Sequence, residues 1–539
     1  MKARRYSFPC ALIALAFGAG PLWAQSAAQS IGITVPSIAT SLPQYGDPFG
    51  TRKWLNDRGI TYSLIYTNDV LGNLSGGIRT GTIDQGKLET QLLVDLEKLA
   101  GWKNWSFYAN AFGIYNDGRI RRDYVGGINT IAAIEATPTV RLSELWLERW
   151  AGPVSFRFGQ LAADAEFFYS DLSQIFLQSD WPTIAAENLP GGGPAYPLSA
   201  VGARIKYEFP KDASLLLAIF NGDPAGPCSG DPDTCNRYGL NFRISDPAFM
   251  IGELQFRRNR GKHDTDLATT LKIGGWTHLG QFPDKRYDNV GVPLASPASN
   301  GMPLLHRGDY GIYGVIDQQL YRPSGGDGDS GVSVFARGSV SPSNQNLINF
   351  YVDGGIVFGG MIPNRPYDRF GASVIYARFS DSVRGFDQDQ INFGTLFTPP
   401  RDYETNLELT YVAQIVPGWT VQPVYTSIWH PSGTGIRYPD AQVTGVRSVV
   451  RFWAKRPARR GHCRAGLPDR REDGRAGADP NGSVVVADLD HAGISEAVVT
   501  RDQTARRTCH VNGGGVGVGN GRGPDQRASG NTDATPVPQ

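Results

Sequence analysis

Four side chains in the stretch "LSELWLERWAGPVSFRFGQ" could together bind a polar molecule. Read at the two-residue period of a β-strand, Glu144, Trp146 and Glu148 share one face, and Arg157 follows after the turn at Ala151-Gly152-Pro153. Carboxylates and a guanidinium make charge-assisted hydrogen bonds to hydroxyl groups, and an indole offers a flat apolar surface for stacking. This chemistry is reversible recognition. The alternative is that the same charges form a ladder that only braces the wall of the protein.

Groups that could carry covalent or metal chemistry are sparse. The histidines of the alternating region, His263, His278, His306 and His430, do not have a metal-ligand spacing. A hydrolase would need a Ser–His pair with an orienting third residue, and no sequence feature places such a pair. Lys and Arg number 52 against 51 Asp and Glu, so a nucleic-acid partner has no electrostatic support. We therefore predict no enzyme, no metal and no cofactor.

The elements that must position these side chains are alternating segments of about ten residues, which recur from Gly59 to Phe452. In "AVGARIKYEF", apolar residues alternate with polar ones, so that a strand would have one apolar and one polar face. "LNFRIS" and "GELQFR" repeat the pattern. The residues that we assign to the polar face are Glu144, Trp146, Glu148, Arg157, Arg204, Lys206, Glu208, Arg243, Glu253 and Arg257.

Short turns alternate with long polar connections along the same region. "GWKN", "AGP", "PKD", "SDPA" and "VPG" are short and have aromatics beside them, including Phe249, whereas residues 116–138 and 221–237 are long and rich in Gly, Asp and Asn. This asymmetry is typical of an outer-membrane β-barrel. A soluble β-sandwich also alternates. About 390 residues at about 24 per strand and connection give about sixteen strands, which leave an aqueous channel.

The first residues favour the membrane barrel. "MKARRYS" is a basic segment, "FPCALIALAFGAGPL" is apolar and "LWAQS" offers a cleavage site after Ala24, so residues 1–24 are read as a signal peptide. Residues 25–58 would then be a periplasmic segment with a short helix, and residues 59–452 the barrel. After the signal no run of eighteen apolar residues follows, so no spanning helix is expected.

In a barrel, the polar face of the opening hairpin must face water. Pairing Trp150 with Pro153 would place Glu148 opposite Ser155 and Trp146 opposite Arg157, with one polar face on both strands. Turned to lipid, that face would bury two carboxylates in hydrocarbon at a cost of a few kcal/mol. The same pairing puts Arg141 and Arg149 on the outer face, where we expect them near the membrane interfaces.

A long insertion lies between Ala162 and Leu198. "AEFFYSDLSQIFLQ" places Phe168, Leu172 and Phe176 at helical spacing, and the rest is extended and rich in Gly and Pro. A loop of this length in a compact fold usually has a function or is disordered. We expect it to fold into the pore as a constriction. The alternative is an external cap.

The motifs "LSGGIRTG", "QLLVDLEKLAGW", "LSELWLERW", "RFGQLAADAEFF", "YPLSAVGARIKY" and "VQPVYTSIWHPSG" with "DAQVTGVRSVVRF" resemble the carbohydrate-selective outer-membrane porins of the OprB type. The resemblance runs from about Thr51 to Phe452. It implies a monomeric sixteen-stranded barrel in the bacterial outer membrane, with a narrowed pore for monosaccharides. Contacts with outer-membrane lipid, lipopolysaccharide and the barrel-assembly machinery are implied too. The alternative is a non-conducting outer-membrane or exported β-protein that binds ligands or partners.

A lumen with the ten assigned residues would be polar but mixed in sign, so that neither ion sign gains a large field. Such a lining suits paired sugar hydroxyls, which can bond to Arg and carboxylate, while Trp146 could stack on a sugar ring. The cluster "GRIRRDY", residues 118–124, is expected to be a solvated loop, or alternatively to recruit lipopolysaccharide or narrow the pore.

Five cysteines divide unevenly. Cys228 and Cys235 bracket a Gly/Asp/Pro loop in an exported protein, so a disulfide is expected between them. Cys463 and Cys509 lie in a tail, residues 453–539, that is rich in Gly, Ala, Arg, Asp and Pro and has no aromatic residue after Trp453. Such a composition builds no packed core, and we read the tail as disordered or as an out-of-frame translation.

Overall fold

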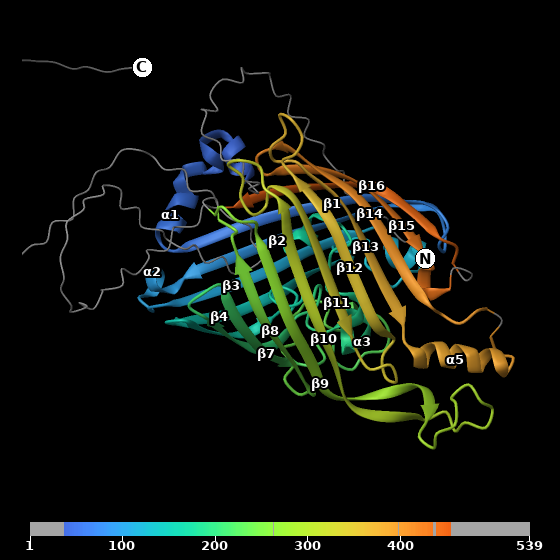
Figure 1. Ribbon diagram of the computed structural model, residues 1–539. Helices are drawn as coiled ribbons and strands as arrows, with labels where there is room; N and C mark the ends of the chain where they lie inside the picture. Colours follow the sequence, from blue (N-terminus) through green and yellow to red (C-terminus); the bar gives the residue numbers. More distant parts are fainter. Residues whose placement is uncertain (1–36, 262–263, 397, 435–437, 454–539) are drawn as a thin grey trace, which may run out of the picture. The chain divides into compact units, whose positions relative to one another are not determined.

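In the computed structural model, described over residues 37–261, 264–396, 398–434 and 438–453, sixteen antiparallel strands form a closed barrel. Each strand pairs with its neighbours in the sequence, and β1 pairs with β16 (Figure 1). The predicted barrel is confirmed. The strands are β1 Ile60–Ser75, β2 Gly81–Asp95, β3 Trp105–Asn116, β4 Thr139–Ala151, β5 Val154–Leu161, β6 Ala200–Glu208, β7 Ala213–Asn221, β8 Ala248–Arg258, β9 Thr269–Asp288, β10 Pro303–Tyr321, β11 Gly331–Val340, β12 Ile348–Gly359, β13 Arg369–Phe379, β14 Tyr403–Val416, β15 Trp419–Trp429 and β16 Ala441–Trp453.

Short helices occur in the connections and before the barrel. Among the described residues, none of them is long and apolar enough to cross a membrane. The α-helices are α1 Thr51–Asp57, α2 Leu96–Ala100, α3 Thr183–Asn188, α4 Pro232–Cys235 and α5 Asp381–Asn392. The 3₁₀ and π turns are η1 Ile38–Ser41, η2 Pro43–Gly46, η3 Pro48–Gly50, η4 Ile120–Val125, η5 Leu172–Ile175, η6 Pro190–Gly192 and η7 Pro431–Gly433.

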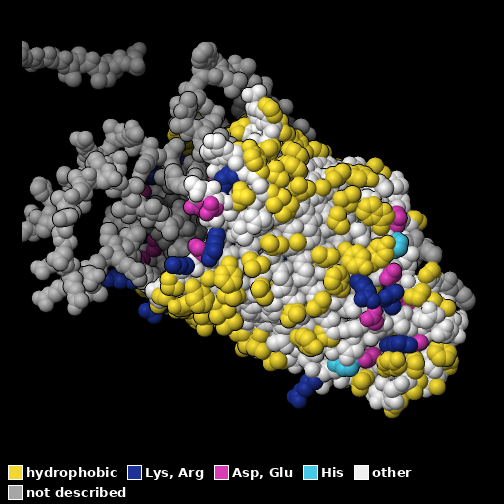
Figure 2. Space-filling model, in the orientation of Figure 1, with side chains coloured by type: hydrophobic (Ala, Val, Ile, Leu, Met, Phe, Trp, Pro, Cys, Tyr) yellow, Lys and Arg dark blue, Asp and Glu magenta, His cyan; other side chains and the backbone are white. Residues whose placement is uncertain are grey.

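Strand β6 shows why these sequences close into a barrel. Arg204 and Lys206 point inward and are 1% and 0% exposed, whereas Ile205 between them is 49% exposed on the outer face. The apolar side therefore faces lipid and the polar side faces the lumen, as in other membrane barrels. Figure 2 shows hydrophobic side chains over the middle of the visible face, with charged side chains gathered toward the two ends.

The opening hairpin forms in a register that differs from the expected one. Ala151 pairs with Val154 around a two-residue turn, so Glu148 lies opposite Arg157 and Trp146 opposite Gly159. The turn has two residues as expected, but it lies one residue later, at Gly152-Pro153, where Gly152 adopts a positive φ of 60°. A shift by two residues leaves every side chain on its expected face.

Arg141 does not lie at a membrane interface as expected. The pairing of β3 with β4 shifts between Ala109 and Ala111, and this bulge in β4 turns Arg141 to the inner face. Arg141 is 2% exposed there and donates to the carbonyl of Asn236 at 3.0 Å. Arg149, beyond the bulge, remains on the outer face near the short turn and lies over the ring of Trp105.

The segment "LNFRIS" is not a strand, and the prediction that Arg243 lines the pore is wrong. The residues from Gly222 to Pro247 connect β7 to β8, so residues 240–245 have no strand to pair with. Ile244 is 79% exposed, and Arg243 forms an ion pair with Asp246 at 2.6 Å within the same connection. The segment "SDPA", residues 245–248, which we expected to be a short turn, therefore lies at the end of this long connection.

The ends of the barrel are close to the expected ones. β1 begins at Ile60, and β16 ends at Trp453, which we had assigned to the tail. Phe452 pairs with Leu64 of β1 and thereby closes the ring of strands. The predicted signal peptide and the tail from residue 454, with Cys463 and Cys509, lie outside the described residues.

Candidate functional site

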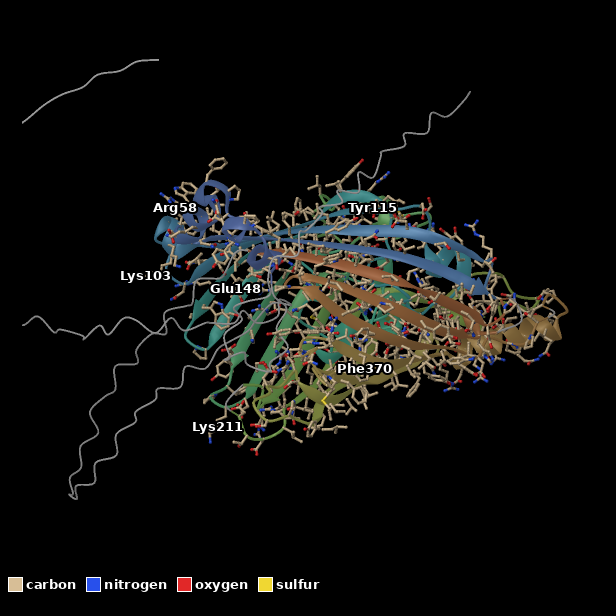
Figure 3. All side chains as sticks on the ribbon, turned by 90° about the horizontal axis from the view of Figure 1, so that it is seen from above. Arg58, Lys103, Tyr115, Glu148, Lys211 and Phe370 are labelled. Atoms are coloured by element: carbon tan, nitrogen blue, oxygen red, sulfur yellow. A yellow bond between two sulfur atoms is a disulfide. The ribbon has the colours of Figure 1, made fainter. Side chains whose placement is uncertain are left out.

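Two arginines and two glutamates form a closed network inside the barrel, which we call the charge quartet (Glu148, Arg157, Glu166 and Arg204). Arg204 Nη2 lies 3.0 Å from Glu148 and 2.7 Å from Glu166, and Arg157 lies 3.3 Å and 3.2 Å from the same two carboxylates. All four side chains are at most 11% exposed. Glu148, labelled in Figure 3, lies farther along the barrel than Arg58 and Lys103, which are at the end with the short turns. The quartet is neutral overall.

Glu166 belongs to the long insertion, so the quartet ties the loop to the wall. Burial alone would raise the pKa of Glu166, but Arg157 and Arg204 hold this pKa at about 2. The carboxylate is therefore ionised throughout the physiological range. Sequence reasoning missed Glu166 because it lies in a segment without strand periodicity.

Trp146 is enclosed on both faces. Tyr108 of β3 stacks on its ring with centroids 4.8 Å apart, and the guanidinium of Arg157 on β5 lies 3.8 Å from the ring centroid. Because β3 and β5 flank β4 on opposite sides, the two neighbours cover opposite faces of the indole. The ring is only 4% exposed, so a ligand has no free face to stack on. Trp146 Nε1 is buried and has no hydrogen-bond partner among the described residues.

The other predicted polar residues lie on the inner wall, apart from Arg243. Glu144 accepts from the amide of Ala162 at 3.3 Å, at the start of the loop. Lys206 forms an ion pair with Glu208 at 3.0 Å. Glu253 accepts from the amide of Phe168 at 2.8 Å, and Arg257 hydrogen-bonds to Tyr169. The ten predictions thus divide into nine wall residues and one loop residue.

The long insertion, which we call the inward loop (residues 162–199), lies inside the barrel. Phe168 stacks on Tyr313 of β10 with centroids 4.0 Å apart, and Phe176 packs against Phe335 of β11. Leu172 packs against the same cluster as Phe176. The expected amphipathic helix is replaced by the short η5 turn, because the loop's backbone bonds to the wall instead of to itself.

A charged pair on the inner face of β2 is more exposed than the quartet, and sequence reasoning missed it. Lys87 lies 3.3 Å from Glu89, and their side chains are 15% and 16% exposed. The Lys87 ammonium lies 4.8 Å and 4.7 Å from the ring centroids of Phe112 and Tyr196. The alternation in "IDQGKLETQ" carries this signal, because it places Lys87 and Glu89 on one face.

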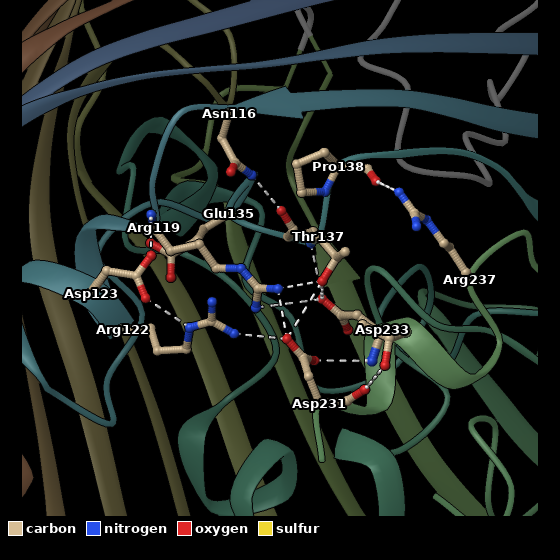
Figure 4. A network of polar contacts seen from close by, with 12 residues as sticks. Asn116, Arg119, Arg122, Asp123, Glu135, Thr137, Pro138, Asp231, Asp233 and Arg237 are labelled. Atoms are coloured by element: carbon tan, nitrogen blue, oxygen red, sulfur yellow. Dashed lines mark hydrogen bonds and ion pairs between the residues drawn. The ribbon is translucent and has the colours of Figure 1, made fainter. Parts of the chain in front are cut away.

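A second network joins two of the long connections to each other (Figure 4). Arg119, in the β3–β4 connection, lies 2.6 Å from Asp231, and Arg122 lies 2.8 Å from the same carboxylate. Asp231 is in the loop between Cys228 and Cys235, which form a disulfide. Burial alone would raise the pKa of Asp231, but Arg119 holds it below its ordinary value. The Arg119–Arg122 cluster is thus paired within the protein.

Comparison with known proteins gives a consistent result. A model of the carbohydrate-selective porin, OprB family, matches residues 79–452. Porin B of Pseudomonas aeruginosa is 26% identical over 461 residues, which cover 81% of this chain and 96% of that protein. The high-pH structure of Pseudomonas putida OprB superimposes with a TM-score of 0.68 at 23% sequence identity, over 76% of this chain and 98% of that chain. This structural likeness shows the same fold.

Proposed function

This chain belongs to the OprB family of carbohydrate-selective porins and is a sugar-selective channel of the bacterial outer membrane, and we propose that it passes glucose-like monosaccharides between the charge quartet and the Lys87–Glu89 pair. Transport is passive diffusion and involves no enzymatic step. The observation that carries the proposal is the inward loop, which lies inside the barrel and is tied to the wall by Glu166.

The charges of this region favour a neutral polar solute over an ion. The quartet holds two cations and two anions, and Lys87 with Glu89 adds one of each. An ion of either sign meets no large net field there. A pyranose can replace its hydrogen bonds to water with hydrogen bonds to these charged side chains, so that few hydrogen bonds are lost as it passes.

The accessible groups decide which residues touch the sugar. Lys87 and Glu89 are partly exposed, whereas Arg204 is almost completely buried. We therefore assign direct sugar contact to Lys87 and Glu89, with Phe112 and Tyr196 as the neighbouring aromatic surface. Trp146 and Arg157 act mainly by holding the quartet, because both side chains are buried.

Glucose titration of single channels in planar bilayers tests the proposal. Wild-type protein should conduct ions, and glucose should reduce or interrupt the current at millimolar to molar concentration. Lys87→Met and Glu89→Gln should weaken this block several-fold. Arg149→Ala, on the outer face, is the matched control and should leave the block unchanged.

Each result has a defined meaning. A channel without any glucose effect would contradict sugar passage, and a folded protein without conductance would favour a binding protein. Equal glucose block in wild type, Lys87→Met and Glu89→Gln would move the contact site away from β2. Arg157→Ala should shift ion selectivity toward cations, because Glu148 and Glu166 lose a counter-charge.

A further inference from the structure

The inward loop is joined inside the barrel to a second loop, the β3–β4 connection (residues 117–138). The amide of Ala133 donates to the carbonyl of Leu177 at 2.8 Å, and Thr183 donates to the side chain of Asn129 at 2.8 Å. Arg121 lies 3.5 Å from Glu187. These contacts connect two segments that leave the wall at different strands, so the lumen is narrowed by a joined pair of loops.

A carboxylate of strand β14 binds the backbone of the second loop at residues 128 and 129. Glu404 of β14 is fully buried and accepts from the amides of Ile128 at 2.8 Å and Asn129 at 2.7 Å. It also accepts from the amide of Ser432 at 2.8 Å. Two carboxylate oxygens thus bind three backbone N–H groups, which a neutral amide side chain cannot do, because it has only one acceptor oxygen.

The glycine at position 127 fits this arrangement. A Cβ atom at Gly127 would lie 2.8 Å from Glu404 Oε1 and 3.2 Å from its carboxyl carbon. The loop backbone approaches the carboxylate so closely that a side chain would displace it. Glu404 and Gly127 therefore form one contact, which can be disturbed from either side.

The neighbouring inward residue of the same type, Glu408, holds the other loop. Its two oxygens accept from the amides of Leu177 and Gln178, both at 2.8 Å. Strand β14 therefore positions both loops, each by one carboxylate. The inward loop is also held by the quartet, whereas residues 128–129 of the β3–β4 connection bind Glu404 through both backbone amides and through the Asn129 side chain, which donates to the Glu404 carbonyl at 3.2 Å.

We propose that Glu404 is a positioning residue of the constriction, which fixes Ile128 and Asn129 of the β3–β4 connection in place and thereby sets the gap and the sugar selectivity. The proposal rests on the assignment of this region as the sugar path. Glu404 does not touch the sugar. It acts through the backbone of Ile128 and Asn129.

Single-channel recording of Glu404→Gln and Gly127→Ala tests the proposal. Both variants should show a several-fold weaker glucose block and a higher or flickering ion conductance, with normal heat-modifiable migration of the folded barrel. Gly113→Ala is the matched control, since a Cβ there meets only ordinary contacts, the nearest at 3.9 Å from Leu88. It should behave as wild type.

A merely structural role predicts a different pattern. In that case Glu404→Gln and Gly127→Ala would lower the thermal stability but leave conductance and glucose block at the wild-type values, which would overturn the proposal. If Glu404→Gln does not fold, Gly127→Ala alone decides. Absence of glucose block in the wild type would instead overturn the sugar path, and a change of conductance in the two variants would still support the positioning role of Glu404.

Discussion

The inward carboxylates on two sides of the barrel are neutralised in different ways. On β4, Glu148 faces the two guanidiniums of Arg157 and Arg204. On β14, Glu404 and Glu408 face backbone N–H groups of the two loops. Both solutions offset the cost of burying a charge. The first builds a wall that carries fixed charges, and the second uses the charges to position loops.

This difference separates two functions that look alike in the sequence. A carboxylate paired with arginine can be recognised when both members lie on strands, because the register brings them together. A carboxylate that binds backbone N–H groups has partners that every residue possesses. Removing one side chain of the quartet should therefore change the charge of the lumen and the stability of the barrel. Removing Glu404 or Glu408 of β14 should instead change the position of a loop.

The largest effect is expected from Arg204→Ala. Arg204 bonds to Glu148, Glu166 and Ser155, and its loss leaves two buried carboxylates to share Arg157. Removing one partner of a buried ion pair typically costs about 3–5 kcal/mol. Urea unfolding in detergent micelles should show a loss of this order, and reversal potentials should shift toward cation selectivity.

A second substitution checks the cause of that loss. Combining Arg204→Ala with Glu166→Gln removes one surplus negative charge and should recover part of the stability. No recovery would mean that Arg204 contributes through packing, and the contrast between the two walls would then not be one of charge pairing.

A smaller loss of stability with a larger rise in conductance is expected for Glu408→Ala. The amides of Leu177 and Gln178 lose their acceptor, and a buried unsatisfied donor typically costs about 1–3 kcal/mol. Water can replace the carboxylate as the loop moves, so part of that cost is relieved. Single-channel conductance should rise. Thr405→Ala, on the outer face of the same strand, is the control.

The barrel and its inward face could be read from the sequence, because both follow from a period of two residues. Strand number and the inward position of Glu148 and Arg204 rest on that regularity, whereas the porin family was identified from the resemblance of its motifs. Arg141 was misplaced since a bulge changes the period locally. Arg243 was misplaced since alternation does not reveal whether a segment has a strand to pair with.

The loop contacts could not be read from the sequence. Glu166 and Glu404 meet partners that lie 38 and 276 residues away, and no period links them. The only sign of the close approach at Gly127 in the sequence is the glycine itself, and it stands in a loop that contains other glycines. The fold was therefore predictable, whereas the constriction depends on contacts that only the folded loops create.

A modest effect is expected from Trp146→Phe compared with Trp146→Ala. Phenylalanine keeps a ring between Tyr108 and Arg157 but lacks the indole N–H. If the ring acts by holding Arg157, Trp146→Phe should bind glucose almost as wild type does, and Trp146→Ala should bind it several-fold more weakly. A similar loss in both variants would show that the indole N–H itself contacts the sugar.

The smallest effect, a change with pH, concerns Asp180 of the inward loop. Burial and the neighbouring charge of Asp164 raise the pKa of Asp180 to about 7. The folded loop therefore binds a proton that the unfolded chain releases near pH 4. The loop therefore loses stability as pH rises from about 4 to about 7, and acidification from pH 8 to pH 5.5 should stabilise it.

Thermal denaturation in detergent and open-channel noise at these two pH values measure this stabilisation. Asp180→Asn cannot ionise, so it should show less pH dependence than the wild type and resemble the wild type at pH 5.5. Glu166, held at a pKa of about 2 by Arg157 and Arg204, stays charged over the same range and contributes nothing to the difference. Equal pH dependence in wild type and Asp180→Asn would assign the titration to other carboxyl groups. The contrast between arginine-paired and amide-held carboxylates would then need to be tested at those groups one by one.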